Sequence, residues 1–152
     1  MKVVDTNVFS ELLKPRREQR VVDWMDRQPP ESLYLCAMSV AEVLTGIVKM
    51  PQGRRRDCVQ EGTQLLLRRF EGRVLPFDEK AASKYAEIQG ALKAKGEAIS
   101  VPDCLIASVA AANGFAVVTR DVQPFRAAGL EVINPWGNMI LATGGSGRLA
   151  FV

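Results

Sequence analysis

The stretch Lys2-Val3-Val4-Asp5-Thr6-Asn7 decides how this chain folds. Its apolar part is short and β-branched, which predicts a strand buried within a sheet. The polar residues that follow are typical of the point where a strand ends and a helix begins, and we expect that helix over 7–14, stopped by Pro15. A second stretch, Phe115 to Asp121, again places an aspartate after an apolar strand. Helices therefore follow strands repeatedly along the chain, which predicts an α/β fold.

The rest of the chain continues this alternation. The expected strands lie at 2–4, 32–36, 73–75, 115–119 and 130–133, and the expected helices at 7–14, 21–28, 39–50, 54–71, 78–95, 100–113 and, as a short turn, 123–128. Pro76 directly after the third strand suggests an edge position. We therefore expect one three-layer domain over 1–136, with a mainly parallel five-stranded sheet flanked by helices. Residues 137–152 include Gly-Gly-Ser-Gly and show little pattern, so they are expected to form a flexible C-terminal tail.

Composition narrows the chemistry. The chain has 152 residues, a formal net charge of +3 and no histidine. Without an imidazole, histidine-dependent triads and histidine-containing zinc sites are excluded. Three widely spaced cysteines suit a reducing compartment, and no signal peptide or membrane span is visible, so the expected location is the cytoplasm. The mild positive charge permits a nucleic-acid partner without demonstrating one.

Four acidic residues lie between an expected strand and the helix that follows it, or in the first turn of a helix. They are Asp5, Glu42, Asp103 and Asp121. The carboxyl ends of parallel strands and the starts of the following helices line one edge of a sheet, so these carboxylates can converge. Clustered oxygen ligands without histidine favour a magnesium or manganese site, and hence phosphoryl chemistry on a nucleic acid.

Helix capping is the competing interpretation of each acid. Ser39 to Glu42 and Ser100 to Asp103 both have the Ser-x-x-acid spacing of a capping box. Asp5 and Asp121 are each placed to cap the helix that follows. Position weakens this interpretation for the last two, because their strands look fully buried and therefore central. Asp78 follows the edge strand instead, and we interpret it as a cap only.

The order of these short motifs resembles the PIN-domain ribonucleases. The shared features are Asp-Thr-Asn after the first strand, Ala-Glu in the third helix, Asp-x-x-Ile-Ala at 103–107 and Thr-x-Asp at 119–121. The likeness is closest to the VapC-type toxins of bacterial toxin–antitoxin pairs. Arg-Val-Leu-Pro-Phe-Asp at 73–78 and Asn-Pro-Trp at 134–136 resemble the FitB branch. The resemblance covers residues 1 to about 136.

The resemblance implies an active site made of Asp5, Glu42, Asp103 and Asp121, with all four present. Asp5 and Asp103 are expected to be the principal ligands of Mg²⁺ (or Mn²⁺), with Asp121 completing the site and Glu42 binding a second ion or orienting water. Asn7 and Thr119 match polar positions that support the acids or the water. The expected reaction is hydrolysis of an RNA phosphodiester by a metal-activated water, which needs no histidine base.

The expected partners are RNA, an antitoxin and a second copy of the chain. Arg120, between Thr119 and Asp121, is the best single phosphate-contact candidate, although pairing with one of the acids is its rival role. Further basic candidates for RNA binding are Arg54, Arg55 and Arg56, then Lys14, Arg16, Arg17 and Arg20. The competing interpretation of each is a residue on a solvated helix or loop face, without a role in RNA binding. Family resemblance implies a small DNA-binding antitoxin that blocks the acidic site, and a homodimer. Apolar residues near the N-terminus are available for the dimer or for the core: Val8, Leu12, Leu13, Trp24 and Leu44.

Two other functions remain open at this stage. A haloacid-dehalogenase-like phosphatase also begins with an aspartate after the first strand, but its chemistry needs a second acid two residues on, where this chain has Asn7. A non-cleaving partner in a DNA-bound antitoxin repressor complex would carry the same acids. Cleavage of labelled RNA with Mg²⁺ separates these alternatives.

Overall fold

One parallel sheet organises the molecule. The computed structural model describes residues 1–137, and the expected tail lies almost entirely outside them. The strands are β1 (Lys2–Val4), β2 (Leu33–Cys36), β3 (Val74–Leu75), β4 (Ala116–Val118) and β5 (Val132–Ile133). They stand in the order β3-β2-β1-β4-β5, and every neighbouring pair is parallel. The predicted α/β class is confirmed, with β1 in the middle, β2 and β4 on either side of it and β3 at an edge.

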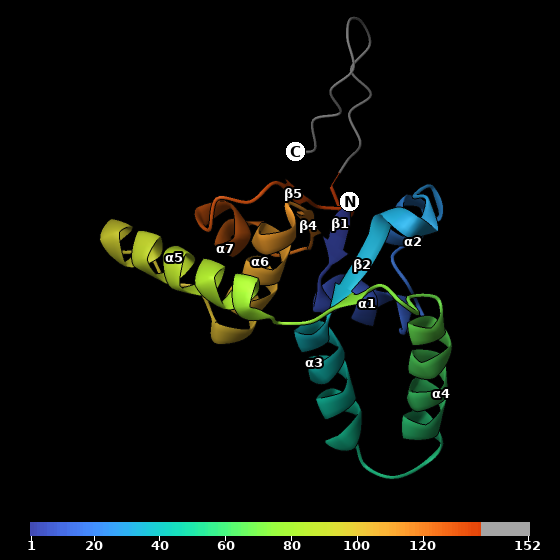
Figure 1. Cartoon of the computed structure of the whole chain (residues 1–152). Helices are drawn as coiled ribbons and strands as arrows, with labels where there is room; N and C mark the ends of the chain where they lie inside the picture. The colour runs from blue at the N-terminus through green and yellow to red at the C-terminus, as the bar shows by residue number, and fades with distance from the viewer. Residues whose placement is uncertain (138–152) are drawn as a thin grey trace, which may run out of the picture.

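Helices cover both faces of this sheet (Figure 1). On one side lie α1 (Thr6–Leu12), α2 (Gln19–Asp26), α3 (Ala37–Val48) and α4 (Arg54–Arg68), and on the other lie α5 (Glu79–Lys95), α6 (Val101–Asn113) and α7 (Val122–Ala127). A 3-10 turn, η1 (Pro30–Ser32), leads into β2. Helices α3 and α4 extend past the sheet as an arm (Figure 1). The result is the expected three-layer arrangement.

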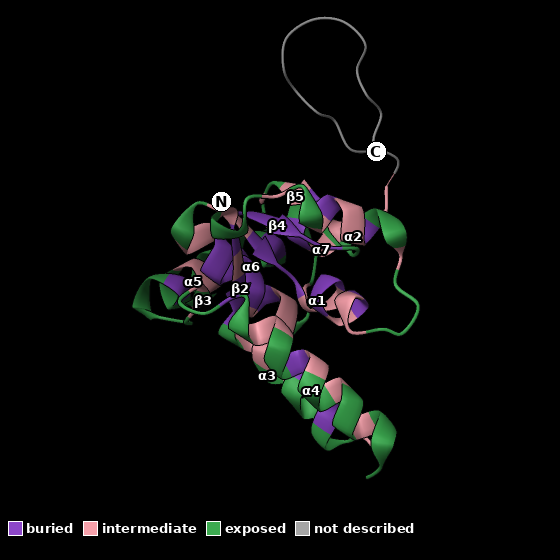
Figure 2. Ribbon diagram, turned by 90° about the vertical axis from the view of Figure 1, so that its right-hand side faces the viewer, coloured by how far each residue is buried: buried purple, intermediate pink, exposed green. Residues whose placement is uncertain are grey.

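Alternating side chains divide the core in two. Val4 and Val118 face the cluster that packs under α1 to α4, whereas Val3 and Val117 face the cluster under α5 to α7. All four are fully buried, and Figure 2 shows the central strands as buried in the core of the domain. A strand covered on both faces must be apolar at every position, which is why the pattern in the sequence is continuous rather than alternating.

Helix starts are where the structure differs most from the expectation. Helix α3 begins at Ala37, directly after β2, so Glu42 lies in its second turn and not its first. Ser39 is therefore not a cap, and the capping-box interpretation of Ser39 to Glu42 is wrong. The other interpretation of this type is confirmed, because the Ser100 hydroxyl accepts the Asp103 backbone N–H at 3.2 Å. Asp78 likewise caps α5.

The hydroxyl of Ser39 is buried and has no hydrogen-bond partner within the described part of the chain. We therefore expect Ser39→Ala to leave the free energy of unfolding unchanged or to raise it by about 1 kcal/mol, because it removes an unsatisfied polar group. Ser100→Ala is the matched control and should lower it by about 1 kcal/mol through loss of a cap. Urea denaturation measures both, and a comparable loss in the two variants would contradict the difference.

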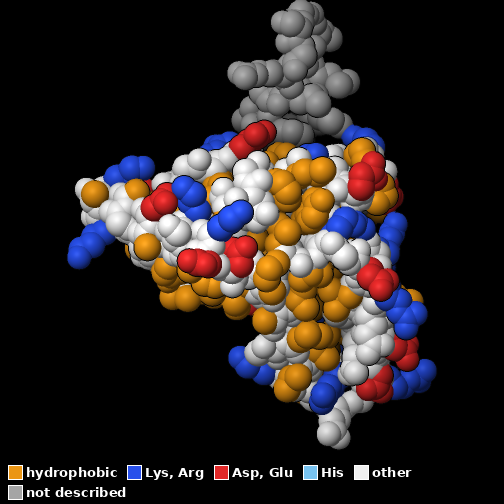
Figure 3. All heavy atoms as spheres, viewed as in Figure 1, with side chains coloured by type: hydrophobic (Ala, Val, Ile, Leu, Met, Phe, Trp, Pro, Cys, Tyr) orange, Lys and Arg blue, Asp and Glu red, His pale blue; other side chains and the backbone are white. Residues whose placement is uncertain are grey.

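The apolar residues near the N-terminus mostly serve the core. Val8 and Trp24 are buried, and Leu12 and Leu13 pack against the same cluster. Only Leu44 of that set is exposed. Figure 3 shows hydrophobic side chains gathered on the arm, where Val48 is 69% and Leu65 63% exposed. Within residues 1–137, no helix is long and apolar enough to cross a membrane.

Candidate functional site

Asp5 occupies the carboxyl end of β1, at the centre of the sheet. Its backbone N–H continues the sheet by donating to the Val118 carbonyl at 2.9 Å. Its side chain caps α1, because Oδ1 accepts the Thr6 backbone N–H at 2.6 Å. The residue is only 4% exposed. The capping interpretation is therefore correct for Asp5, but one cap does not account for the second carboxylate oxygen.

That second oxygen belongs to a network centred on Thr119, just beyond β4. The buried Thr119 hydroxyl donates to Asp5 Oδ2 at 2.7 Å. The same hydroxyl oxygen accepts from Asn7 Nδ2 at 2.9 Å and from the Asp121 backbone N–H at 3.0 Å. Asn7 Oδ1 in turn accepts the Arg120 backbone N–H at 3.0 Å. This network joins the ends of the two central strands and fixes the Asp5 carboxylate.

Glu42 and Asp103 approach the same edge from α3 and α6. Glu42 Oε2 accepts a short hydrogen bond from the Thr6 hydroxyl. Asp103 Oδ2 accepts from the Ser100 hydroxyl at 2.6 Å. Sequence reasoning missed the part played by Thr6, because nothing in the sequence shows that the start of α1 lies beside the second turn of α3.

Electrostatics shows which acids are neighbours. Burial raises the pKa of the Asp5 carboxyl from an ordinary 3.8 to about 6, against the hydrogen bonds from Thr119 and Thr6 that lower it. The negative charges of Asp103 and Glu42 raise the pKa further. The charges of Asp103 and Glu42 are therefore near enough to act on the Asp5 carboxyl. Asp121, which is exposed, is tied to it through its backbone contact with Thr119, and its side chain makes no capping hydrogen bond.

The donor set fits a hard divalent cation in its chemistry. It consists of carboxylate oxygens, which Mg²⁺ and Mn²⁺ favour as ligands, with an excess of negative charge around a buried Asp5. In the described residues, however, no three acidic, cysteine or histidine side chains stand close enough together to form a ready-made metal site. Glu42 and Asp103 are instead hydrogen-bonded to neighbouring hydroxyl groups.

The raised pKa of Asp5 makes stability depend on pH. The folded protein keeps the Asp5 proton up to about pH 6, whereas the unfolded chain loses it near 3.8, so this contribution to stability is complete below 3.8. As pH rises from about 4 to 6 the wild type should lose about 3 kcal/mol relative to Asp5→Asn, which lacks the group. Urea denaturation in EDTA measures both proteins, and a constant difference across this range would contradict the shift.

Basic residues border the acids unevenly. A groove of about 970 Å³ runs between α1, α3 and α4, and Thr6 and Glu42 line it together with Arg55, Lys14 and Arg17. Arg54 and Arg56 stand at the start of α4 but are not among its lining residues. Arg16 is exposed, and Arg20 is engaged by Glu18 and the Trp136 carbonyl. The Arg120 guanidinium lies over the Trp136 ring, 5.8 Å from its centroid.

Comparison with known proteins decides the family. The PIN domain model matches residues 2–130. This chain belongs to the PIN domain family. Among its relatives, the VapC ribonuclease Y4jK of Sinorhizobium fredii is 47% identical over 90% of this chain and 98% of its own length. Toxin FitB of Neisseria gonorrhoeae is 41% identical over 90% of this chain and 99% of its own length. The chain is thus a member of the VapC-type toxins, as the resemblance implied.

Solved structures agree with this placement. The crystal structure of FitAcB from Neisseria gonorrhoeae superposes with a TM-score of 0.85 at 40% identity, over 90% of this chain and 99% of that chain. A structure of FitAB bound to an IR36 DNA fragment gives the same score and identity, over 90% of this chain and 96% of that one. The topology around Asp5 is therefore that of an established PIN-domain fold.

Proposed function

We propose that this chain is the toxin of a toxin–antitoxin pair in the cytoplasm and hydrolyses RNA phosphodiester bonds at the edge formed by Asp5, Glu42, Asp103 and Asp121. The observation that carries the proposal is the buried Asp5 carboxylate, fixed by Thr119 and raised in pKa by burial and by two neighbouring acids. The relative Y4jK, 47% identical, is a VapC ribonuclease. Membership of the PIN family supports the same chemistry.

Asp5 and Asp103 would be the main ligands of Mg²⁺ or Mn²⁺, with Glu42 and Asp121 completing the site. When bound, such a cation lowers the pKa of water and stabilises the charge that develops on a phosphate. The protein supplies the positioning. Thr119 and Thr6 hold the Asp5 oxygens in place, and burial makes the uncompensated negative charge of Asp5 costly, which favours binding of a cation.

RNA would lie in the groove that Glu42 and Thr6 line. Arg55, Lys14 and Arg17 stand on the same groove and would contact phosphates along the strand. This selects Arg55 from the three arginines at the start of α4, since Arg54 and Arg56 do not line the groove. Arg120, next to Asp121, would contact a phosphate closer to the acids.

A small DNA-binding antitoxin would block this site. A second, partly apolar groove of about 480 Å³ lies between α1, α2 and α4 and includes Leu12, Met25 and Leu66. Leu13 and Arg17 line both grooves, so the two are continuous. An antitoxin segment held in the apolar groove would reach the acids. The exposed Leu44 and Val48 on α3 are the surface that we propose for a homodimer.

The test is cleavage of labelled RNA by the purified chain. We expect cleavage with Mg²⁺ or Mn²⁺, loss of cleavage in EDTA and products with 5′-phosphate ends. Restoration by fresh Mg²⁺ is the control for irreversible damage by the chelator. Cleavage that is unaffected by EDTA would contradict metal dependence, and absence of cleavage under all these conditions would contradict the nuclease function.

One alternative is favoured by a specific observation. The related FitAB is known in a structure bound to DNA. A chain that binds operator DNA together with its antitoxin, and cleaves no RNA, would act chiefly in a repressor complex. Gel-shift assays of the pair on upstream DNA, run beside the cleavage assay, separate the two functions.

A further inference from the structure

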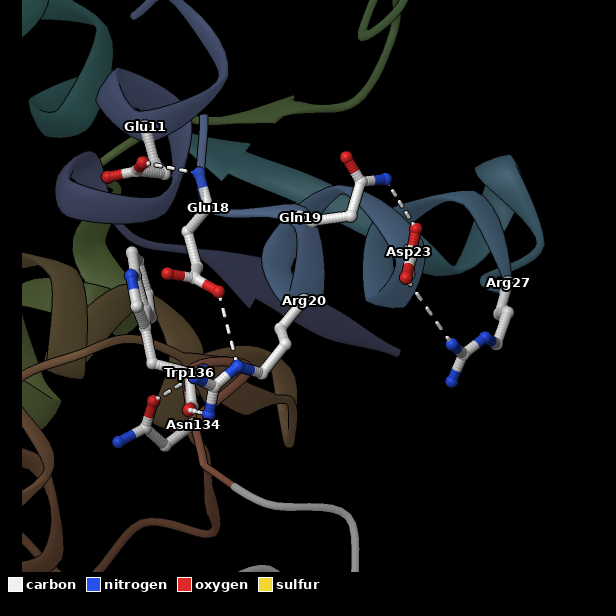
Figure 4. A network of polar contacts seen from close by, with 8 residues as sticks. All are labelled: Glu11, Glu18, Gln19, Arg20, Asp23, Arg27, Asn134 and Trp136. Atoms are coloured by element: carbon white, nitrogen blue, oxygen red, sulfur yellow. Dashed lines mark hydrogen bonds and ion pairs between the residues drawn. The ribbon is translucent and has the colours of Figure 1, made fainter. Parts of the chain in front are cut away.

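Trp136 is held at the carboxyl edge of the sheet by its backbone. The Trp136 N–H donates to Asn134 Oδ1 at 2.9 Å, and its carbonyl accepts from Arg20 Nη1 at 3.1 Å. Arg20 also contacts Glu18 Oε1 at 3.2 Å, so the segment after β5 is tied to α2 (Figure 4). These contacts place the indole without using its ring. The Trp136 side chain packs against the core cluster, but the residue stays partly exposed.

Arg120 brings that ring to the catalytic acids. Its backbone N–H is bound by Asn7, and its neighbours in the chain are Thr119, which donates to Asp5, and Asp121. Its guanidinium is exposed and lies over the Trp136 ring. Arg120 directly follows the threonine that fixes Asp5, so their Cα atoms are about 3.8 Å apart. The Arg120–Trp136 pair is therefore adjacent to the proposed catalytic site.

The charge of Arg120 is not neutralised by an ion pair. No carboxylate lies within 4.0 Å of its guanidinium in the part of the chain that the structure describes. The Arg120 charge does lower the pKa of Glu11, but only as the weakest of several causes, the first being a hydrogen bond from Lys14. Glu11 is already paired with Lys14 at 2.6 Å. The predicted pairing of Arg120 with an active-site acid is therefore absent, and its charge remains available to a phosphate.

The two tryptophans of the chain differ in environment. Trp24 is buried in the core, whereas Trp136 packs against the same cluster but is only partly buried. An indole beside an unpaired arginine offers a π-face and a cation in one place. Single-stranded nucleic acids are bound by such pairs, because every base stacks on an aromatic ring and arginine adds a contact to phosphate.

We propose that Trp136 and Arg120 bind the nucleotide next to the scissile phosphate, with the indole stacking on the base and the guanidinium contacting a phosphate. This inference rests on the proposed ribonuclease function and adds base stacking to it. Because stacking accepts any base, Trp136 strengthens binding more than it sets sequence preference.

Intrinsic fluorescence tests the stacking directly. The probe is a single-stranded oligoadenylate of about ten nucleotides, within the usual site sizes, added in EDTA so that it is not cut. We expect it to quench the wild-type fluorescence and to leave Trp136→Phe, which retains only Trp24, unquenched. A strand of equal length and charge built from abasic sites should bind about 5- to 150-fold more weakly and quench little. Equal quenching of the wild type and Trp136→Phe would overturn the proposal.

Two further variants separate stacking from folding and from charge. Trp136→Leu keeps an apolar packing group without a ring, and should raise KM for RNA about tenfold or more while kcat and the melting temperature change little. Arg120→Gln should weaken binding of both the intact and the abasic strand, because both strands carry the phosphate that the guanidinium contacts. A Trp136→Leu variant with wild-type KM, or with lower stability as its only defect, would overturn the role in stacking.

The outcome also distinguishes this proposal from the function on which it rests. A wild-type chain that cleaves RNA with Mg²⁺ but binds intact and abasic strands equally refutes the stacking proposal alone. A wild-type chain that neither binds nor cleaves RNA refutes both, and the cleavage assay shows this before any variant is made.

Discussion

Asp5→Asn is expected to cleave RNA about a thousandfold more slowly than the wild type while remaining folded. The substitution keeps the size of the side chain and removes an acid that is buried at the end of the middle strand of the sheet. A loss of this size corresponds to about 4 kcal/mol, within what a metal site contributes through charge stabilisation. Initial rates with saturating Mg²⁺ measure the effect, and circular dichroism verifies the fold.

Asp78→Asn is the matched control for this variant. Asp78 also follows a strand and also caps a helix, with its Oδ1 accepting the Ala81 backbone N–H at 2.9 Å. It is exposed, however, and it follows the edge strand β3. Because asparagine caps helices as well as aspartate does, Asp78→Asn should retain wild-type rate and stability. Equal rates for Asp5→Asn and the wild type would show that the Asp5 carboxylate is not part of the catalytic site.

The sheet could be predicted because its signals are local. Val3 and Val4, like Val117 and Val118, are continuous apolar pairs, and a strand buried on both faces needs this composition. Pro76 marked the edge strand, since proline cannot donate to a neighbouring strand. The same reasoning placed Asp5 at the carboxyl end of a central strand. These predictions are confirmed by the strand order.

The start of α3 could not be predicted by the same means. Ser39 and Glu42 have capping-box spacing, but the helix begins two residues before Ser39, directly from the strand. Packing decided this, because Val43 and Ile47 are buried against the core and set the register of the helix. Glu42 remains a proposed residue of the site, although its expected place in a first turn was wrong.

Contacts between distant segments could not be predicted from the sequence either. Thr6 meets Glu42 across 36 positions, and Arg120 meets the Trp136 ring only because β4 and β5 are neighbours in the sheet. Such contacts depend on the exact placement of helices and loops, for which the sequence carries no local signal. The ordered set of motifs predicted the acids of the candidate site, but not the hydroxyl groups that bond to Asp5, Glu42 and Asp103.

Thr119→Val is expected to lower the free energy of unfolding by about 3 kcal/mol and kcat/KM for RNA by about 10- to 100-fold. Valine has the shape of threonine but leaves three polar groups without their partner: Asp5 Oδ2, Asn7 Nδ2 and the Asp121 N–H. The loss of stability follows because one buried and two partly buried polar groups are left unsatisfied. The loss of activity follows because residues that orient a metal ligand typically contribute this much.

Thr119→Ser separates the hydroxyl from the methyl group. Serine retains all three hydrogen bonds, so its kcat/KM should stay within a few-fold of the wild type even if loss of a buried methyl costs about 1 kcal/mol of stability. The hydrogen bond from Thr119 also lowers the Asp5 pKa, so Thr119→Val should keep Asp5 protonated to a higher pH and move the acid limb of the pH–rate profile upward. Equal activity and equal profiles for the valine and serine variants would mean that Asp5 is held in place without Thr119, and that the buried network serves folding alone.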